Sequence, residues 1–230
     1  MDIILKSNRI RAHINVGKNK IAYSILISFI LGLSLGLVAK ILDSPIIPNE
    51  ISILGLIGSN WGLWIFISTL IAVYSYTPKL AAIRVFIFLI SMLLSYYTYT
   101  ILFLHLFPLK YMFFWCILAL LSMIPAYIIW FSHVNHLISN FVIALPISVI
   151  AFEGYKIYLS TVDYYEHFKQ YENILISKGN YFYMLGTEIS YTLMIIIILL
   201  VVPKRKKQCL YIIPFSVVVF SALVAIMQML

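Results

Sequence analysis

Long apolar runs, separated by short polar breaks, recur along the whole chain. Seven of them stand out, at about 21–40, 61–77, 84–107, 111–131, 137–158, 186–202 and 209–229. Each is close to the ~20 residues with which a helix crosses a ~30 Å hydrocarbon core. A transmembrane barrel needs ~10-residue segments of alternating polarity, and the sequence does not have this pattern. It predicts an all-α fold, a polytopic membrane helix bundle of about seven transmembrane helices, with residues 1–230 as one membrane domain.

Several residues mark predicted helix boundaries. Asn60 is a candidate cap of the second span, and Pro78 is expected to end that span because proline cannot continue the hydrogen-bond ladder. Pro125, Pro146 and Pro214 fall inside later runs and are expected to kink them. The apolar segment 46–59 lies in the membrane interface, re-enters the membrane or extends the second span; the interfacial placement is favoured.

Charge is scarce and unevenly placed. Of 230 residues, 63% are hydrophobic and 10% are charged, against about 25% charged in soluble domains. With the basic segment 1–20 in the cytoplasm, eleven of the sixteen Lys and Arg residues fall on that side: Lys6, Arg9, Arg11, Lys18, Lys20, Lys79, Arg84, Lys204, Arg205, Lys206 and Lys207. Because Lys and Arg favour the cytoplasmic side, the N-terminus is predicted inside and the C-terminus outside. These cations are expected to attract anionic lipids, not nucleic acid.

Glu153 and Lys156 interrupt the fifth apolar run, "ALPISVIAFEGYKIYLS". At 1.5 Å per residue from about Leu137, Glu153 lies roughly 24 Å along the helix, in its outer part. Two placements are open. Glu153 forms an interfacial pair with Lys156, which is the favoured placement, or it faces the bundle interior as part of a ligand or ion pathway.

The third span carries hydroxyls and an imidazole in "SYYTYTILFLH". Tyr96, Tyr99 or Thr100, and His105 are candidates for one polar inner face in its outer half, with Tyr97 pointing elsewhere. Such groups line a ligand pathway or, more commonly, make hydrogen bonds between helices. Gly32 and Gly36 form a small-x-x-x-small pattern that predicts close helix packing.

An acidic, tyrosine-rich outer loop is expected at 160–185, partly helical over 161–176 and lying along the membrane surface. Several residues in or near this loop, together with His105, are candidates for binding a divalent cation or a basic partner on the outer face: Asp163, Glu166, His167, Glu172 and Glu188. A solvated loop face is the commoner arrangement for such residues.

No catalytic set or cofactor motif is found. His133 and His136 have spacing compatible with two metal ligands, but no nearby acid or cysteine completes a site, and no metal is expected. His136 and Asn140 resemble one element of membrane-embedded CAAX-type proteases, but the paired glutamates of those enzymes are missing. Walker-type, G-x-S-x-G and H-E-x-x-H motifs are also missing.

The centre of the chain resembles an uncharacterised family of small bacterial multi-pass membrane proteins. The matching features lie within about 60–130: Asn60 with Trp61 or Trp64, Pro78 with Ala81 and Ala82, Tyr96–Tyr97, and Trp115. The resemblance implies a bacterial plasma (inner) membrane location and no particular activity.

Two main functions are therefore expected, from different classes. The first is transport, as a small permease or as the membrane subunit of a complex that includes another membrane protein or an ATPase subunit. The second is a non-transporting sensor or accessory protein that binds a ligand or partner through its outer loop. A lipid-modifying enzyme is a minor third alternative.

Overall fold

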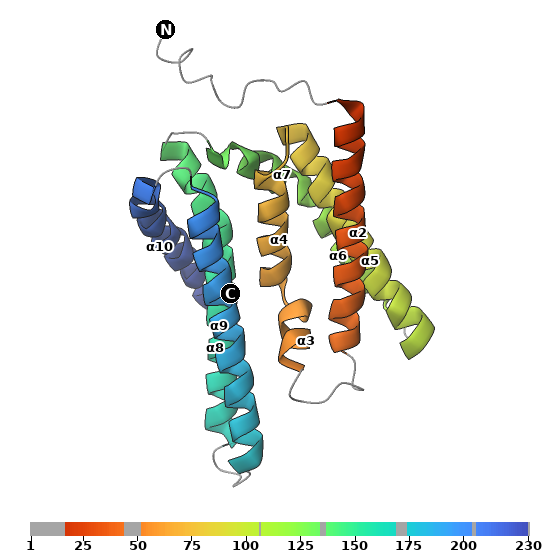
Figure 1. Cartoon of the computed structure of the whole chain (residues 1–230). Helices are drawn as coiled ribbons and strands as arrows, with labels where there is room; N and C mark the ends of the chain where they lie inside the picture. The colour runs from red at the N-terminus through yellow and green to blue at the C-terminus, as the bar shows by residue number, and fades with distance from the viewer. Residues whose placement is uncertain are drawn as a thin grey trace.

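The computed structural model of the protein describes residues 17–43, 52–105, 107–133, 137–168, 174–203 and 206–229. Over these ranges the chain is helical between short breaks and contains no strand (Figure 1). The elements are α2 (Lys18–Leu42), α3 (Ser52–Ser59), α4 (Trp61–Val73), α5 (Pro78–Leu104), α6 (Leu109–Leu121), α7 (Met123–Ile129), the 3₁₀ turn η1 (Trp130–His133), α8 (Leu137–Phe168), α9 (Ile174–Val201) and α10 (Lys206–Met229).

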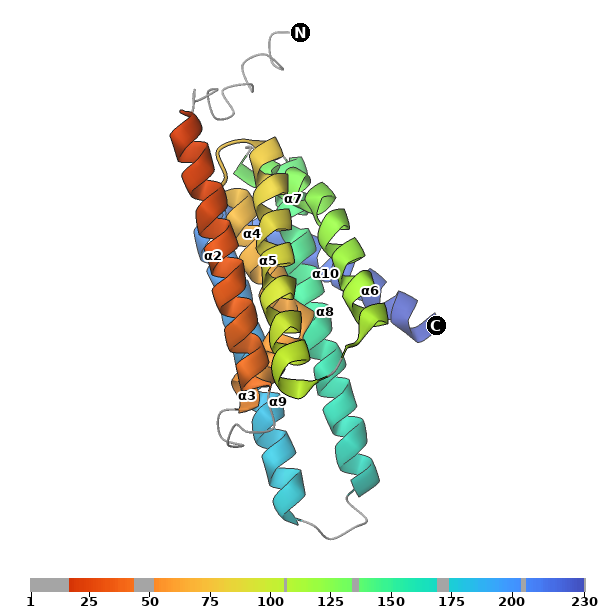
Figure 2. The same cartoon turned by 90° about the vertical axis from the view of Figure 1, so that its right-hand side faces the viewer.

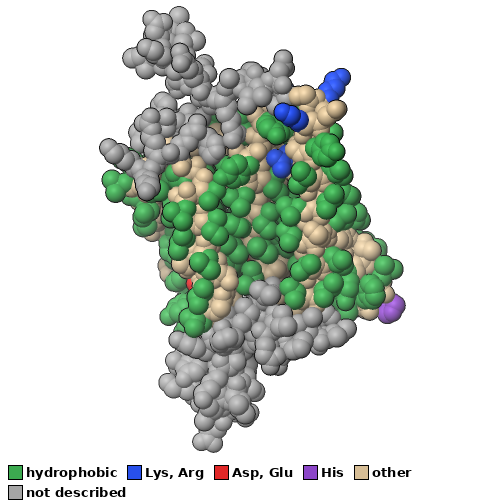
Figure 3. Space-filling model, in the orientation of Figure 1, with side chains coloured by type: hydrophobic (Ala, Val, Ile, Leu, Met, Phe, Trp, Pro, Cys, Tyr) green, Lys and Arg blue, Asp and Glu red, His purple; other side chains and the backbone are tan. Residues whose placement is uncertain are grey.

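Among the described residues, five helical segments are long and apolar enough to cross a membrane: Lys18–Leu42, Pro78–Leu104, Leu109–Ser132, Ser139–Ser160 and Gln208–Met229. Two shorter apolar helices, Trp61–Val73 and Leu185–Val201, coincide with the second and sixth predicted spans. Green apolar side chains cover most of the described surface between the two ends of the bundle (Figure 3). Because water would not favour such a surface, these features indicate a helical membrane protein.

The helices form two groups with α3 and α4 between them (Figure 1). One group contains α2, α5, α6 and α7, and the other contains α8, α9 and α10. Each group has its own buried cluster, centred on Phe88 in the first and on Ile150 and Ile198 in the second. Helix α4 contacts members of both groups, so the second predicted span is the central element of the bundle.

Helix α2 packs along α5 through a stripe of small residues. Ser24, Ser28, Gly32 and Gly36 recur at every fourth position and are all buried. A Cβ added at Gly32 would overlap the Phe88 carbonyl oxygen, and one at Gly36 would overlap that of Met92. The predicted packing role of the two glycines is therefore confirmed, because only a residue without a side chain fits this approach.

Arg84 joins α2, α5 and the turn that follows α4. Its Nε donates to the Ser24 carbonyl at 3.1 Å and to Ser28 Oγ at 3.0 Å, and one terminal nitrogen donates to Ser75 Oγ at 3.0 Å. The sequence placed Arg84 at the loop end of the third span; the structure places it inside α5. Its guanidinium links α2, α5 and the turn after α4 through neutral oxygen atoms.

Two predicted boundaries are wrong. Helix α4 ends at Val73 rather than at 77, and Pro78 begins α5 instead of ending the second span. Thr77 caps α5 by accepting from the Leu80 N–H at 3.2 Å, and proline is favoured in the first helical turn because its missing N–H needs no partner there. The fourth predicted span divides into α6 and α7 near Ser122, where Pro125 offers no N–H to the Leu121 carbonyl.

Helix α3, the described part of 46–59, packs against the bundle, and the favoured interfacial placement of this segment stays a prediction. A Cβ on Gly55 would overlap the Leu42 carbonyl, and Ile57 is 6% exposed. Helix α3 contacts α2, α4 and α9. It lies end to end with α4 in both views (Figures 1 and 2), and the two helices form one path interrupted at Asn60.

Helices α8 and α9 cover most of the segment expected as an outer loop. Helix α8 continues to Phe168 and α9 begins at Ile174, so the predicted boundaries 160 and 185 both fall within helices. Both helices extend past the ends of α2 and α5 (Figure 2). The sequence has no glycine or proline between Gly154 and Gly179, and without these helix breakers the helical pattern continues.

Candidate functional site

The interruption between α3 and α4 is the central feature of the site. Asn60 has extended backbone angles, φ −96° and ψ 160°, and occupies the predicted cap position, but its side chain makes no capping hydrogen bond. Glu153 of α8 takes that role, because its Oε1 accepts from the Trp61 N–H at 2.7 Å. The Trp64 indole donates to the Gly58 carbonyl at 2.9 Å. Side chains thus satisfy backbone groups on both sides of the break.

Glu153 faces the bundle, so the favoured pairing with Lys156 is wrong. Within the described chain the one side-chain ion pair joins Lys40 and Asp43, and Lys156 is exposed. The carboxylate turns inward because the N-terminus of α4 presents unpaired N–H groups with partial positive charge. The alternative placement of Glu153 in the bundle interior is therefore the one observed.

Glu188 and Tyr191 of α9 lie beside Glu153. Tyr191 is 2% exposed. Three oxygen atoms here are buried and have no hydrogen-bond partner: Glu153 Oε2, Glu188 Oε1 and Tyr191 Oη. We call the group Glu153, Glu188 and Tyr191 the carboxylate niche.

Two glycines make room for the niche. A Cβ on Gly62 of α4 would lie 2.9 Å from Tyr191 Cζ and 3.2 Å from Glu153 Oε2. A Cβ on Gly154 of α8 would lie 3.1 Å from Tyr191 Cδ2 and 3.3 Å from Glu188 Oε2. The tyrosine ring therefore sits between α4 and α8, with one carboxyl group near each of two parts of the ring.

The sequence predicts part of this niche. Glu153 is a ligand- or ion-pathway candidate in the less favoured of its two placements, Glu188 belongs to the predicted outer-face group, and Tyr191 is not predicted. The structure brings Glu188 into the bundle, whereas Asp163 is exposed on α8. Tyr191 belongs to a buried stripe with Thr187, Met194 and Ile198. Helical spacing could have shown that stripe, but an α9 that is apolar all round does not reveal which stripe faces inward.

The remaining outer-face candidates do not form a described site. Glu166 and His167 belong to α8, but the structure does not describe their side chains. Glu172 lies outside the described residues. The side chains of His133 and His136 are also outside the described set. Among the residues that the structure describes, no group of three or more His, Cys, Asp or Glu could hold a metal ion.

Tyr96 belongs to a second polar cluster, at the end of α2. Its Oη donates to Asp43 Oδ2 at 3.1 Å, and Lys40 Nζ lies 3.1 Å from the same carboxylate oxygen. Lys40 Nζ also approaches Tyr96 Oη at 3.4 Å and the ring centroid at 4.8 Å. Tyr96 of α5 therefore bonds to an ion pair at the end of α2 and is not part of the carboxylate niche.

Tyr99 and His105 do not join Tyr96 on a common inner face. The Tyr99 ring stacks on Phe103 with centroids 4.6 Å apart. His105 is exposed and ends α5 in the left-handed conformation, φ 53°, where its N–H donates to the Thr100 carbonyl. Tyr97, expected to point elsewhere, is 7% exposed and buried in the bundle. The inner face of α5 therefore carries Tyr97 and Thr100 rather than Tyr99 and His105.

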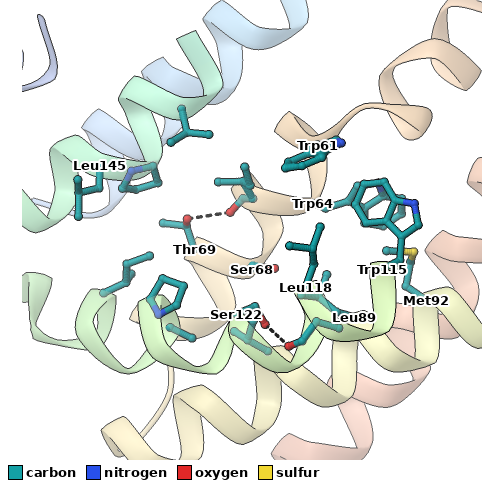
Figure 4. Close-up of a pocket in the computed structure, with 18 of the residues that line it drawn as sticks. Trp61, Trp64, Ser68, Thr69, Leu89, Met92, Trp115, Leu118, Ser122 and Leu145 are labelled. Atoms are coloured by element: carbon teal, nitrogen blue, oxygen red, sulfur yellow. Dashed lines mark hydrogen bonds between the residues drawn. The ribbon is translucent and has the colours of Figure 1, made fainter. Parts of the chain in front are cut away.

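An apolar cavity of about 360 Å³ lies between α4, α5, α6, α7 and α8. Trp61, Trp64 and Trp115 line one side of it and Leu145 the opposite side (Figure 4); we call it the tryptophan cavity. Thr69 and Ser122 on its wall bond to backbone carbonyls of their own helices, whereas the buried Ser68 Oγ has no partner. Ser68 therefore offers a hydrogen bond inside an otherwise apolar space.

A second cavity, of about 530 Å³, extends from Lys40 and Tyr96 toward the tryptophans. We call it the lysine cavity. It shares four lining residues with the tryptophan cavity: Trp64, Met92, Leu93 and Trp115. The two cavities therefore adjoin, and Trp61, whose ring lies 5.2 Å from that of Trp115, stands between the tryptophan cavity and the carboxylate niche.

No protein-family model, curated protein or solved structure matches the chain. The family membership implied by the resemblance over about 60–130 therefore stays a prediction, and the functional argument rests on the geometry of this molecule.

Proposed function

We propose that the chain is a small transport protein of the bacterial plasma membrane, acting as a permease or as the membrane subunit of a transport complex. The observation that carries the proposal is the interrupted helix pair α3–α4, which lies between two helix groups beside adjoining cavities. Membrane transporters commonly build their binding sites at such discontinuous helices, between parts of the bundle that move against each other.

The proposed topology has seven spans: α2, α3–α4, α5, α6–α7, α8, α9 and α10. In the view of Figure 3, the visible Lys and Arg side chains gather at the end where α2 begins. By the positive-inside tendency, this distribution supports a cytoplasmic location of this end and of the N-terminus, near anionic lipids. The C-terminus lies outside, and the carboxylate niche belongs to the outer half of the bundle.

The cavity walls favour an amphipathic solute. The lysine cavity would admit it from the outer end, next to the charged Lys40–Asp43 pair, and the tryptophan cavity would hold its apolar part. Ser68 Oγ supplies a single hydrogen bond for orientation. Sites of this kind, mostly apolar with few polar groups, are typical of small-molecule binding.

Binding is the first test, because a permease and a transport subunit both require it. Three of the four tryptophans line the tryptophan cavity, so a bound solute should change the tryptophan fluorescence of the purified chain. The probes are octanoate and tetraphenylphosphonium as amphipathic solutes, with alanine and glucose as hydrophilic ones. We expect a saturable change with at least one amphipathic probe, and uptake of that probe into proteoliposomes.

Cavity filling provides the matched control. Ala119 is 2% exposed and lines the tryptophan cavity, whereas Ala222 is exposed on α10. Ala119→Leu should abolish binding and uptake, and Ala222→Leu should leave both unchanged. If the wild-type chain neither binds nor takes up any of the four probes, the transport proposal is wrong. A partner that co-purifies only when residues 162–180 are present would then favour the sensor hypothesis.

A further inference from the structure

The carboxylate niche contains oxygen atoms that the fold itself does not use. Glu153 Oε1 accepts from the Trp61 N–H, but its Oε2 has no partner, and neither do Glu188 Oε1 and Tyr191 Oη. The Tyr191 side chain is almost fully buried, with an exposed fraction of 2%. A buried hydroxyl or carboxylate normally finds a partner, because leaving it unpaired costs free energy. Three such atoms around one tyrosine ring indicate a ligand that supplies the missing partners.

Two glycines mark where the three side chains approach one another. A Cβ added at Gly62 would lie 3.2 Å from a Glu153 carboxylate oxygen, and one added at Gly154 would lie 3.3 Å from a Glu188 carboxylate oxygen. Each of these two positions also lies within 3.1 Å of the Tyr191 ring. The ring therefore lies close to both carboxyl groups. A larger residue at either glycine would displace it.

The charges around the niche determine the sign of the ligand. Helices α3 and α4 carry no titratable side chain, and α9 contributes Glu188 and Tyr191 among the described side chains that face the site. On α8, Lys156 lies one turn from Glu153 but is exposed and makes no ion pair with it within the described chain. The partial positive charge at the α4 N-terminus, about half a unit, does not balance two carboxylates. Groups of this kind inside a membrane need a compensating positive charge.

We propose that the carboxylate niche binds one exchangeable monovalent cation, a proton or an alkali-metal ion, between Glu153, Glu188 and Tyr191. Its role as a coupling ion rests on the transport function proposed above.

The position of Glu153 connects cation binding to the interrupted span. One carboxylate oxygen holds the N-terminus of α4, and the other faces the niche. A cation at Oε2 draws negative charge away from Oε1, which weakens the hydrogen bond to the Trp61 N–H. Occupancy of the niche therefore changes how firmly α4 is held to α8, next to the tryptophan cavity.

The test is the thermal unfolding of the purified full chain in nanodiscs, followed by tryptophan fluorescence. NaCl or KCl replaces choline chloride at constant ionic strength, at several pH values. Because a ligand of the folded state stabilises it, we expect a saturable rise in Tm of about 5–10 °C at hundredfold excess over the dissociation constant. A rise with Na⁺ or K⁺ identifies an alkali-metal ion. A rise with acidification alone, unaffected by either salt, identifies a proton.

Matched variants locate the effect. Glu153→Gln and Glu188→Gln should abolish the response, whereas Asp163→Asn, the same kind of change at an exposed position of α8, should retain it. Tyr191→Phe keeps the ring and removes one ligand atom, so its cation midpoint should shift at least about threefold. No response in the wild type, or the full response in both Gln variants, overturns the proposal. If the Gln variants do not fold, an unchanged midpoint in Tyr191→Phe overturns it.

The two proposals fail separately. The cation response is measured without any solute, and solute uptake is tested with variants of the tryptophan cavity. If the chain responds to cations but takes up no probe, the cation-binding proposal stands and the transport proposal is wrong. If the chain transports a probe but shows no cation response, only the cation-binding proposal is wrong.

Discussion

Replacing Glu153 by alanine should expose how much the interrupted span depends on its side chain. The substitution removes the acceptor of the Trp61 N–H at 2.7 Å and leaves this donor without its partner at the N-terminus of α4. Hydrogen bonds to charged groups contribute about 1.5–3 kcal/mol, and the interaction with the helix terminus adds about 0.3–1 kcal/mol.

The membrane lowers these values. Side-chain hydrogen bonds between membrane helices average about 0.6 kcal/mol, with a maximum near 1.7, because the unfolded chain in the membrane also finds partners. We therefore expect Glu153→Ala to lower the free energy of unfolding by about 1–3 kcal/mol. Glu153→Gln should lower it by less than about 1 kcal/mol, because the amide oxygen can still accept from the Trp61 N–H.

The assay is reversible unfolding in mixed micelles at increasing SDS, followed by circular dichroism. Asp163→Ala is the control, since this acid is exposed on the same helix, and it should change the free energy by less than about 1 kcal/mol. Equal losses in Glu153→Ala and Glu153→Gln would refute the capping role, and so would a loss in Glu153→Ala no larger than in the control.

Three further outcomes are expected in the same assay. Gly32→Ala should destabilise the fold by at least about 2 kcal/mol because its Cβ would meet backbone atoms of α5. Gly58→Ala should cost less, because its Cβ would meet the Ala39 side chain at 3.0 Å. Equal effects of the two substitutions would contradict the packing argument. Arg84→Lys should cost about 1–2 kcal/mol because one ammonium group cannot reproduce the forked contacts to Ser24, Ser28 and Ser75, while Lys79→Arg, at an exposed position, should be nearly neutral. Tyr96→Phe should cost less than about 1 kcal/mol, because the Lys40–Asp43 pair persists without the hydroxyl; a larger loss would show that Tyr96 Oη organises the pair.

The sequence predicted the helical membrane class and most helix positions, because long apolar runs carry that signal directly. It could not place the break at Asn60 within the bundle, since the segment 52–73 is apolar on both sides of it. The inward turn of Glu153 depends on a backbone donor 92 residues away in sequence. No local spacing encodes such a contact. Local spacing alone therefore favoured Lys156 as the partner.

The candidate site shows the same limit. Glu153 was found because an acid within an apolar run is conspicuous, but Glu188 was grouped with the acids nearest to it in sequence. Gly62 and Gly154 matter only because the Tyr191 ring lies between them, and neither forms part of a sequence motif. The predicted polar face of α5 was wrong at Tyr99 and His105, since tyrosine and histidine are also stable at the edge of a bilayer.

The interrupted span also has a consequence for how the protein is made. The Trp61 N–H emerges from the ribosome 92 residues before its acceptor, Glu153. At about 5–20 residues per second, the interval is roughly 5–20 s. During this time an open break in lipid would leave backbone groups unpaired, at a cost of several kcal/mol each. The newborn segment 52–73 should therefore enter the membrane as one straight helix, and bend at Asn60 only when α8 arrives.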